Sequence, residues 1–451
     1  MTGRLLTRRP LAALPERSFC VYGMGVTGAA VAAALVHHDL EVVACDDVID
    51  DATTARAATA GVALHHPDMA GLDALVAGVD AVVPAPGLPD SHGVFAAAER
   101  SDRPILSEFD LAAAWDDRPL VAITGTNGKT TVTTLVTAML RASGIATRDV
   151  GNTEVPLVAA LEDPEDDMFV VEASSFRLGH SRHVRPAVGT WLNFAPDHLD
   201  VHASLDRYEA AKARIWAEQA GTDVAVANLD DPVVMRHAVG PAEVVTFGVT
   251  GADYRVERDR LVGPDGESFG ELGSLFRSLP HDVTNALAAV ATARAGGATL
   301  DGVTTALVAF EGLPHRVALV GSVDGIAYYD DSKATTPHAV ASAVSGFGSV
   351  VLVAGGRNKG IDLSVLGSLA PPVRAVVGIG EAGDEVVAAF PDLPGVATHS
   401  MSAAVDAARQ LAQNGDVVVL SPGCASFDWY RNYHERGEDF SRNVRERMDS
   451  T

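Results

Sequence analysis

Cysteine is scarce in this chain of 451 residues, and long apolar runs are missing. The three cysteines, at positions 20, 45 and 424, lie far apart and lack the spacing of metal ligands. This pattern suits a reducing cytoplasm, and we expect each cysteine to be a small buried residue. Because no run reaches about eighteen apolar residues, we expect no transmembrane helix. The apolar stretch near the N-terminus is too short for a signal peptide, so we expect a ragged terminus there.

Basic residues are also in short supply. The chain has 34 Lys and Arg against 59 Asp and Glu, which gives a formal net charge of −25. So acidic a protein is poorly suited to bind nucleic acid or an anionic membrane. An anionic substrate would have to be held by local features, namely loop amides, helix N-termini and a few well-placed cations.

What the chain does contain is a regular alternation of strands and helices. Its length predicts two or three domains. Apolar strands are expected to begin near residues 19, 41, 81, 121, 168, 187, 224, 350, 375 and 417. Helices are expected between many of them, with a polar connector at 106–119. This α/β pattern predicts parallel sheets covered by helices, with ligands bound at the carboxyl ends of the strands.

The most informative segment is 121–131, a buried strand followed by a glycine loop and a helix. The loop Gly125-Thr-Asn-Gly128 would point backbone N–H groups at a phosphate chain, at the positive end of the helix dipole. Lys129 would reach the terminal phosphates and Thr130 would bind Mg²⁺. Ile123 replaces one glycine of the full phosphate-loop pattern, so the motif is a shortened variant. We interpret it as an ATP site.

A second glycine loop, Gly23-Met-Gly-Val-Thr-Gly28, follows the first strand, and Asp46 and Asp47 follow the next one. This is the fingerprint of a dinucleotide site, so a nicotinamide-dependent oxidoreductase is an alternative. A simple dehydrogenase has no use for the ATP loop, however. We therefore favour a site for a nucleotide diphosphate.

Further polar residues follow the strands of the middle section. Glu172 ends an apolar strand, where it could hold Mg²⁺ or cap the next helix. The loop 193–202 contains two acids and two histidines, among them His198, a density that favours metal or phosphate chemistry. Lys212 lies on a helical stretch and on its own would be interpreted as a solvated helix charge.

The last third contains three polar segments at strand ends: 328–336, the glycine loop 355–360, and 421–428. Together they would form a polar face suited to an anionic small molecule.

These motifs together resemble the Mur ligase family of ATP-dependent ligases along nearly the whole chain. The matching segments are 23–28, 125–131, 151–152, 172–175, 197–200, 211–212, 331–335 and 421–426. The resemblance implies three domains, each with a largely parallel sheet flanked by helices. They would be a Rossmann-like UDP-substrate domain (1–107), a P-loop-type central ATP domain (108–313) and a Rossmann-like amino-acid domain (314–451).

The implied reaction joins D-glutamate to UDP-N-acetylmuramoyl-L-alanine at the expense of ATP, through an acyl phosphate, in cytoplasmic peptidoglycan precursor synthesis. ATP would be a co-substrate, two Mg²⁺ ions are expected, and the family leads us to expect a monomer. No nucleic-acid or membrane partner is implied. Another amino-acid acceptor, such as L-glutamate, and a non-catalytic nucleotide-binding relative remain as alternatives.

The resemblance also implies roles for single residues. Catalytic residues would be Lys129, Glu172, His198 and Lys212, the last as a carbamylated lysine. The metal ligands would be Thr130, Glu172, His198 and Lys212. The ATP site would comprise Gly125, Thr126, Asn127, Gly128, Lys129, Thr130, Thr131, Asn285, Arg316, Asp331 and Lys333. The UDP-substrate site would comprise Gly25, Val26, Thr27, Asp46, Asn152 and His198. D-Glutamate would be held by Thr335, Lys359, Ser426 and Tyr433. The chain departs from the family at Thr153-Glu154, at Asp282 and at Gly423.

Overall fold

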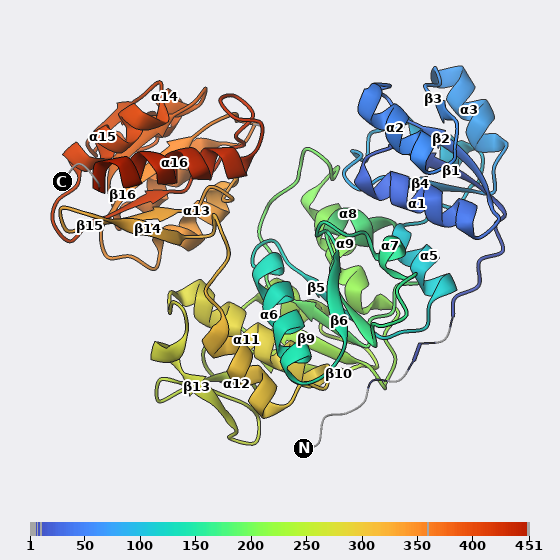
Figure 1. The fold of residues 1–451 in the computed structure, drawn as a ribbon, viewed down its shortest axis with the longest axis horizontal. Coiled ribbons are helices and arrows are strands. Elements are labelled where there is room, and N and C mark those ends of the chain that lie inside the picture. Colours follow the sequence, from blue (N-terminus) through green and yellow to red (C-terminus); the bar gives the residue numbers. More distant parts are fainter. Residues whose placement is uncertain (1–5, 7, 10, 359, 449–451) are drawn as a thin grey trace. The chain divides into compact units, whose positions relative to one another are not determined.

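The computed structural model describes residues 6, 8–9, 11–358 and 360–448. The chain forms two compact units, one comprising Met1–Leu275 and Thr284–Phe310, the other Phe276–Val283 and Glu311–Thr451. The first unit contains three of the four sheets and the second contains one (Figure 1). The predicted boundary between 107 and 108 falls inside the first unit, and the three-domain division stays a prediction.

The N-terminal sheet of the first unit has four parallel strands in the order β3-β2-β1-β4. They are β1 (Ser18–Tyr22), β2 (Glu41–Cys45), β3 (Leu64–His65) and β4 (Ala81–Pro84). The helices of this section are α1 (Val26–His37), α2 (Asp51–Thr59), α3 (Met69–Ala77), α4 (Gly93–Arg100) and α5 (Glu108–Trp115). The segment 106–119, expected to be a polar connector, instead contains the buried helix α5. Ser107 and Asp110 form a capping box there, which gives the segment a helix N-terminus.

The central sheet has six parallel strands in the order β10-β9-β8-β5-β7-β6. They are β5 (Leu120–Thr124), β6 (Thr147–Gly151), β7 (Met168–Glu172), β8 (Val188–Trp191), β9 (Val224–Asn228) and β10 (Glu243–Phe247). Its helices are α6 (Lys129–Ala142), α7 (Leu157–Ala160), α8 (Ser175–His180), α9 (Leu205–Ala217), α10 (Pro232–His237), α11 (Pro280–Ala295) and α12 (Leu300–Ala309). One apolar cluster runs from Phe19 in the N-terminal sheet to Trp191 in the central sheet, so the two sheets share a core.

A small antiparallel sheet follows, made of β11 (Arg255–Glu257), β12 (Arg260–Val262) and β13 (Ser268–Glu271), with the 3₁₀ helix η1 (Leu272–Ser274) after it. It is an addition to the predicted pattern, which contained parallel strands alone. Its strands are three or four residues long, too short for a clear period-two signal.

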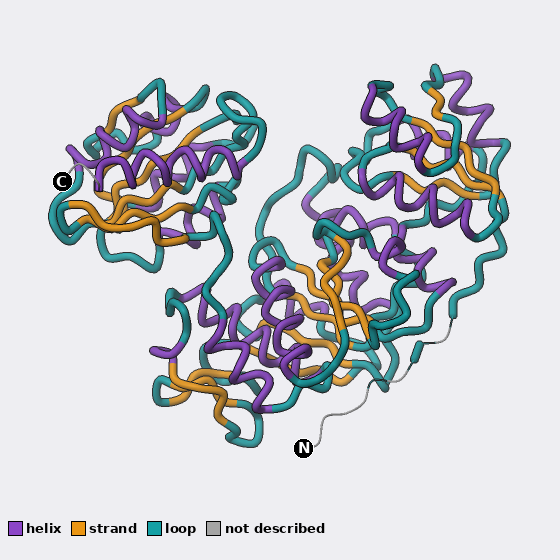
Figure 2. Tube along the Cα trace, in the orientation of Figure 1, coloured by secondary structure: helices purple, strands orange, loops and turns teal. Residues whose placement is uncertain are grey.

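The sheet of the second unit has the order β14-β15-β19-β16-β17-β18 and is parallel except for its edge strand β14. Its strands are β14 (Ala318–Val323), β15 (Ile326–Asp330), β16 (Val350–Gly355), β17 (Val373–Ile379), β18 (Gly395–Ala397) and β19 (Val417–Leu420). Its helices are α13 (Pro337–Val344), α14 (Gly383–Ala388), α15 (Met401–Leu411) and α16 (Tyr433–Met448), with the 3₁₀ helix η2 (Leu363–Leu369). One face packs against α15 and α16, the other against α13 and α14 (Figure 2).

The predicted α/β class with largely parallel sheets is confirmed. Of the helices that the structure describes, none combines the length and the apolar character that a membrane crossing requires.

Candidate active site

The predicted ATP loop connects the carboxyl end of β5 to the first turn of α6. Gly128 has a φ of +85°, a conformation that favours glycine, and it precedes Lys129, the first residue of α6. A Cβ atom at Gly128 would lie 2.5 Å from the Asn285 Oδ1 atom. The structure therefore brings Asn285, on α11, against the ATP loop. Thr130 and Thr131 are half-buried in the first turn of α6.

Two lysines converge on the backbone of this loop. The Nζ of Lys129 donates to the carbonyl oxygens of Gly125 and Thr126, each at 2.9 Å. The Nζ of Lys212, which belongs to α9, donates to the same Gly125 oxygen at 2.7 Å. Lys212 is 1% exposed, so the interpretation as a solvated helix charge is wrong. Burial and the nearby charge of Lys129 hold the pKa of Lys212 well below its usual value.

The loop that follows β8 is bonded to the ATP loop. The Oδ1 of Asn193 accepts from the backbone N–H of Asn127 at 2.9 Å, and the Oγ1 of Thr126 accepts from the N–H of Ala195 at 3.0 Å. The same loop holds His198, whose backbone has a φ of +56°. Burial lowers the pKa of His198, so its imidazole is neutral at pH 7 and can act as a ligand.

Glu172 lies at the carboxyl end of β7 and is 2% exposed. Its Oε1 accepts from the Nδ2 of Asn152 at 2.9 Å, whereas its Oε2 is buried without a hydrogen-bond partner. A buried carboxylate oxygen left in this way suits a bound cation. Within the described ranges, no three His, Cys, Asp or Glu side chains are grouped to hold a metal ion. The mixed ligand set of Thr130, Glu172, His198 and Lys212 stays a prediction.

The first glycine loop is packed tightly between β1 and α1. A Cβ atom at Gly28 would lie 1.8 Å from the carbonyl oxygen of Gly23. Gly25 is the N-cap of α1, and Gly25 and Val26 are both exposed. The Oδ2 of Asp46 accepts from the N–H of Met24 at 2.6 Å, so this carboxylate braces the loop from the end of β2.

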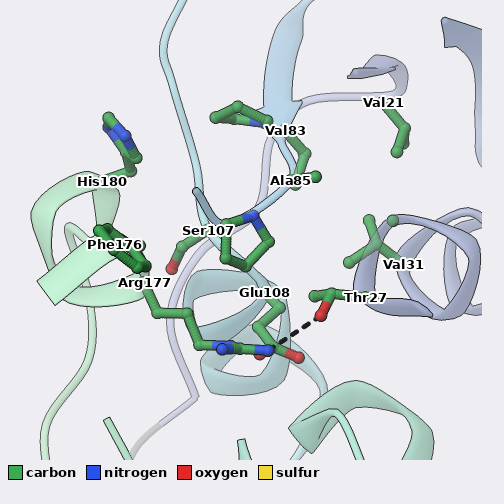
Figure 3. Close-up of a pocket in the computed structure, with 13 residues that line it drawn as sticks. Val21, Thr27, Val31, Val83, Ala85, Ser107, Glu108, Phe176, Arg177 and His180 are labelled. Atoms are coloured by element: carbon green, nitrogen blue, oxygen red, sulfur yellow. Dashed lines mark hydrogen bonds and ion pairs between the residues drawn. The ribbon is translucent and has the colours of Figure 1, made fainter. Parts of the chain in front are cut away.

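Arg177, on α8, is a residue that the sequence reasoning missed. Its guanidinium donates to the Oγ1 of Thr27 and to the Oδ1 of Asn152, each at 2.9 Å, and pairs with Glu108. Thr27, Glu108 and Arg177 border a pocket with about 320 Å³ of space, open solvent included, between the first glycine loop and α8 (Figure 3). Arg177 follows the motif 172–175 by two residues, and only its long-range contacts identify it.

In the second unit, the carboxylate of Asp331 is buried at the end of β15. It accepts from the Oγ of Ser421 at 2.8 Å and from the N–H of Val317 at 3.2 Å. Burial raises the pKa of Asp331 to about 7, although Ser421 and the charge of Arg316 act in the opposite direction.

Among the other predicted residues of this unit, Lys333 and Thr335 follow β15, Ser426 follows β19, and Tyr433 is the first residue of α16. The Nζ of Lys333 lies 5.1 Å from the centroid of the Tyr433 ring, so the structure brings these two together. Thr335 is exposed, whereas Ser426 is 2% exposed. Lys359 lies outside the described residues.

Arg436, on α16, is a second residue that the sequence reasoning missed. Its guanidinium donates to the Oγ of Ser332 at 3.0 Å and to the carbonyl oxygen of Cys424 at 3.1 Å. It therefore ties the segment 331–335 to the segment 421–426. Among the departures from the family pattern, Asp282 has an ion pair with Arg277, 2.6 Å from Nε to Oδ2.

A glycine loop with a lysine, a buried carboxylate and a buried second lysine define an enzyme that acts on the phosphates of a nucleotide. Comparison with known proteins agrees with this class. Residues 123–293 match the model of the Mur ligase middle domain, and residues 315–424 match that of the Mur ligase glutamate ligase domain. The chain belongs to the Mur ligase family, and the predicted resemblance is confirmed.

Related sequences match this chain over nearly its whole length. The UDP-N-acetylmuramoylalanine–D-glutamate ligase of Thermobifida fusca is 39% identical, over 96% of this chain and 99% of that protein. The protein of the same name from Syntrophus aciditrophicus is 38% identical, over 94% of this chain and 97% of that protein.

Solved structures share the fold. The MurF ligase of Thermotoga maritima in complex with ADP has a TM-score of 0.60 at 16% identity, over 99% of each chain. The UDP-N-acetylmuramate–alanine ligase of the same organism has a TM-score of 0.57 at 19% identity, over 96% of this chain and 100% of that chain.

Proposed function

We propose that this chain is an ATP-dependent ligase that joins D-glutamate to UDP-N-acetylmuramoyl-L-alanine, a step of peptidoglycan precursor synthesis. The names of its relatives support the choice of substrates. The structural observation that supports it most directly is the meeting of Lys129 and Lys212 at the carbonyl oxygen of Gly125. The cation Lys129 at the phosphate-binding loop suits a reaction in which two anions must approach each other, and the lowered pKa of Lys212 beside it suits an amine that becomes a carbamate.

The proposed reaction has two steps. An oxygen of the alanyl carboxylate attacks the γ-phosphorus of ATP, the bond to the β-phosphate oxygen breaks, and ADP leaves. The amine nitrogen of D-glutamate then attacks the carbonyl carbon of the acyl phosphate. The tetrahedral intermediate loses phosphate and the nitrogen loses a proton, which leaves an amide. Lys129 would neutralise charge on the transferring phosphoryl group in the first step.

The buried Glu172 oxygen without a partner supports a bound Mg²⁺ ion at this position, and we expect a second ion beside it. When bound, the ions would neutralise phosphate charge and orient the two reacting anions. We assign Thr130 and Glu172 to one ion and His198 and Lys212 to the other, with Lys212 as a carbamate. The rest of the ATP loop would bind the phosphates through its amides, and Asn285 would contact the adenine.

We assign the UDP-substrate to the first glycine loop, with Gly25, Val26 and Thr27 at the diphosphate. The exposed start of α1 supports this, since a helix N-terminus attracts anions. Asp46 would keep the loop in place, and Asn152 would contact the same substrate next to Glu172, with His198 nearby.

The second unit would supply the remaining contacts. Arg316, Asp331 and Lys333 are assigned to the nucleotide. D-Glutamate would be held by hydroxyls and a cation, the expected partners of a dicarboxylate: Thr335, Ser426, Tyr433 and Lys359. The three cysteines are free and buried, which supports a cytoplasmic location. We also propose that the protein acts as a monomer.

The test is phosphate release from Mg-ATP in the presence of UDP-N-acetylmuramoyl-L-alanine. Three parallel reactions would contain D-glutamate, L-glutamate or no acceptor, and Lys129→Ala would serve as the inactive control. We expect release that depends on D-glutamate and is lost in the variant. Release with L-glutamate alone would overturn the acceptor, and no release under any condition would overturn the ligase.

A further inference from the structure

Arg177 connects three elements of the first unit. Its side chain is 6% exposed, and it bonds Glu108 at the start of α5, Thr27 in the first turn of α1 and Asn152 after β6. Figure 3 shows the guanidinium beside the Glu108 side chain, with the bond to Thr27 drawn. One guanidinium therefore contacts both the first glycine loop, through Thr27, and Asn152, which bonds Glu172.

These contacts determine the orientation of the Asn152 amide. Arginine has only donors and an ionised carboxylate has only acceptors. The Oδ1 of Asn152 must therefore face Arg177, and its Nδ2 must face the Oε1 of Glu172, as the structure has them at 2.9 Å each. A flipped amide would place its NH₂ group against the guanidinium and its oxygen against the carboxylate.

The amide in turn determines which oxygen of Glu172 is available. Because Oε1 accepts from Asn152, Oε2 is the oxygen left buried without a partner. This is the atom that the proposed function assigns to Mg²⁺. Asn152 itself is exposed, so a substrate can reach the middle of the chain of hydrogen bonds that runs from Thr27 through Arg177 and Asn152 to Glu172.

Stability alone is a weak reason for this arrangement. Glu108 is 3% exposed, and the desolvation of a buried ion pair offsets most of the attraction within it. Arg177 has two contacts outside that pair. One is with Thr27, which is assigned to the UDP-substrate, and the other is with Asn152, which bonds the proposed metal ligand Glu172. Side chains that orient a metal ligand typically change metal affinity or activity 10- to 100-fold when they are removed.

We propose that Arg177 is a positioning residue that orients Glu172 through Asn152 and links it to the substrate loop at Thr27, so that it sets the Mg²⁺ affinity of the site. This inference rests on the proposed function. Its test measures how ADP binding depends on Mg²⁺ and requires no turnover.

The experiment compares Arg177→Met with Arg118→Met by titration calorimetry of ADP binding at a series of Mg²⁺ concentrations. Arg118 is a matched control, because it is 7% exposed and bonds Asp116 at the opposite, amino end of β5. For Arg177→Met we expect the Mg²⁺ concentration that gives half of the maximal ADP affinity to rise about 10-fold. For Arg118→Met we expect a lower melting temperature and an unchanged Mg²⁺ dependence.

Asn152→Ala tests the same series of hydrogen bonds at an exposed residue, so the inference can be refuted even if Arg177→Met does not fold. Asn152→Ala should raise the Mg²⁺ requirement by a similar factor. The double variant of Arg177→Met and Asn152→Ala should shift it little further, because both changes break the same connection between Arg177 and Glu172. An unchanged Mg²⁺ dependence in a folded Arg177→Met or in Asn152→Ala would overturn the inference, as would an equal shift in Arg118→Met. Failure of the ligase proposal would appear in the wild-type protein, whereas failure of this inference appears only in the variants.

Discussion

Asp331→Asn should change how the stability of the second unit depends on pH. The carboxylate of Asp331 is 6% exposed, and its two oxygens accept from Ser421 and from the backbone of Val317. Asparagine has the same shape, and its oxygen can accept from the Val317 N–H while its NH₂ group donates to the Ser421 hydroxyl. The variant thus removes the titration and keeps the packing.

The size of the effect follows from the pKa of the buried carboxyl. Burial raises it from the ordinary value of 3.8 to about 7. Between these two values the folded protein holds a proton that the unfolded chain has lost, so stability falls as the pH rises from about 4 to about 7. A difference of about three pKa units corresponds to about 4 kcal/mol as an order of magnitude. Relative to wild type, Asp331→Asn should therefore gain up to about 4 kcal/mol between pH 4 and pH 8.

The unfolding of the second unit can be followed separately. The chain has four tryptophans, and Trp429 is the one that belongs to this unit. Urea unfolding of protein labelled with 5-fluorotryptophan would therefore report on the unit through one ¹⁹F resonance, assigned with Trp429→Phe. Asp392→Asn, at an exposed position of the same unit, is the control and should show no such gain. A difference between Asp331→Asn and wild type that is constant from pH 4 to pH 8 would refute the reasoning.

Two further predictions concern the first unit. Burial lowers the pKa of Lys212, so its neutral amine can attack CO₂ and lose a proton to give a carbamate. In ¹³C NMR with ¹³C-bicarbonate, the wild-type protein should show a carbamate resonance that Lys212→Ala lacks. The variant should lose turnover about 100-fold. Turnover at the wild-type rate in Lys212→Ala would rule out a carbamate at this position. Gly28→Ala should destabilise the protein by at least about 2 kcal/mol, because the new Cβ would lie 1.8 Å from the carbonyl oxygen of Gly23. Gly25→Ala has open space at the same loop and should change the melting temperature little, so equal melting temperatures for the two variants would contradict the packing argument.

The sequence alone predicts much of the fold and the family. The glycine loops after β1 and β5 are local features, because a tight turn between a strand and a helix is specified by neighbouring residues. Glu172 at the end of β7 follows from the same kind of pattern. The fold class and the family resemblance both rest on such short segments, and both are confirmed. The residue roles and the domain boundaries that the resemblance implied stay predictions.

Local patterns were insufficient where a segment has little periodicity. Helix α5 was expected to be a connector, and the antiparallel strands β11–β13 were not expected at all. In the first case Trp115 and the surrounding charges concealed a short helix whose residues are buried on most sides. In the second the strands are too short for a clear pattern.

Local sequence patterns are thus enough to predict the class of this protein, its glycine loops and the polar residues that follow its strands. Which of these residues contact one another becomes known only from the packed structure. Lys212 reaches the carbonyl of Gly125 across 87 residues, Ser421 reaches Asp331 across 90, and Arg177 reaches Thr27 across 150. Burial at these contacts lowers the pKa of Lys212 and raises that of Asp331. Desolvation and partners from distant segments exist only after the sheets have packed, and for that reason no local pattern contains them.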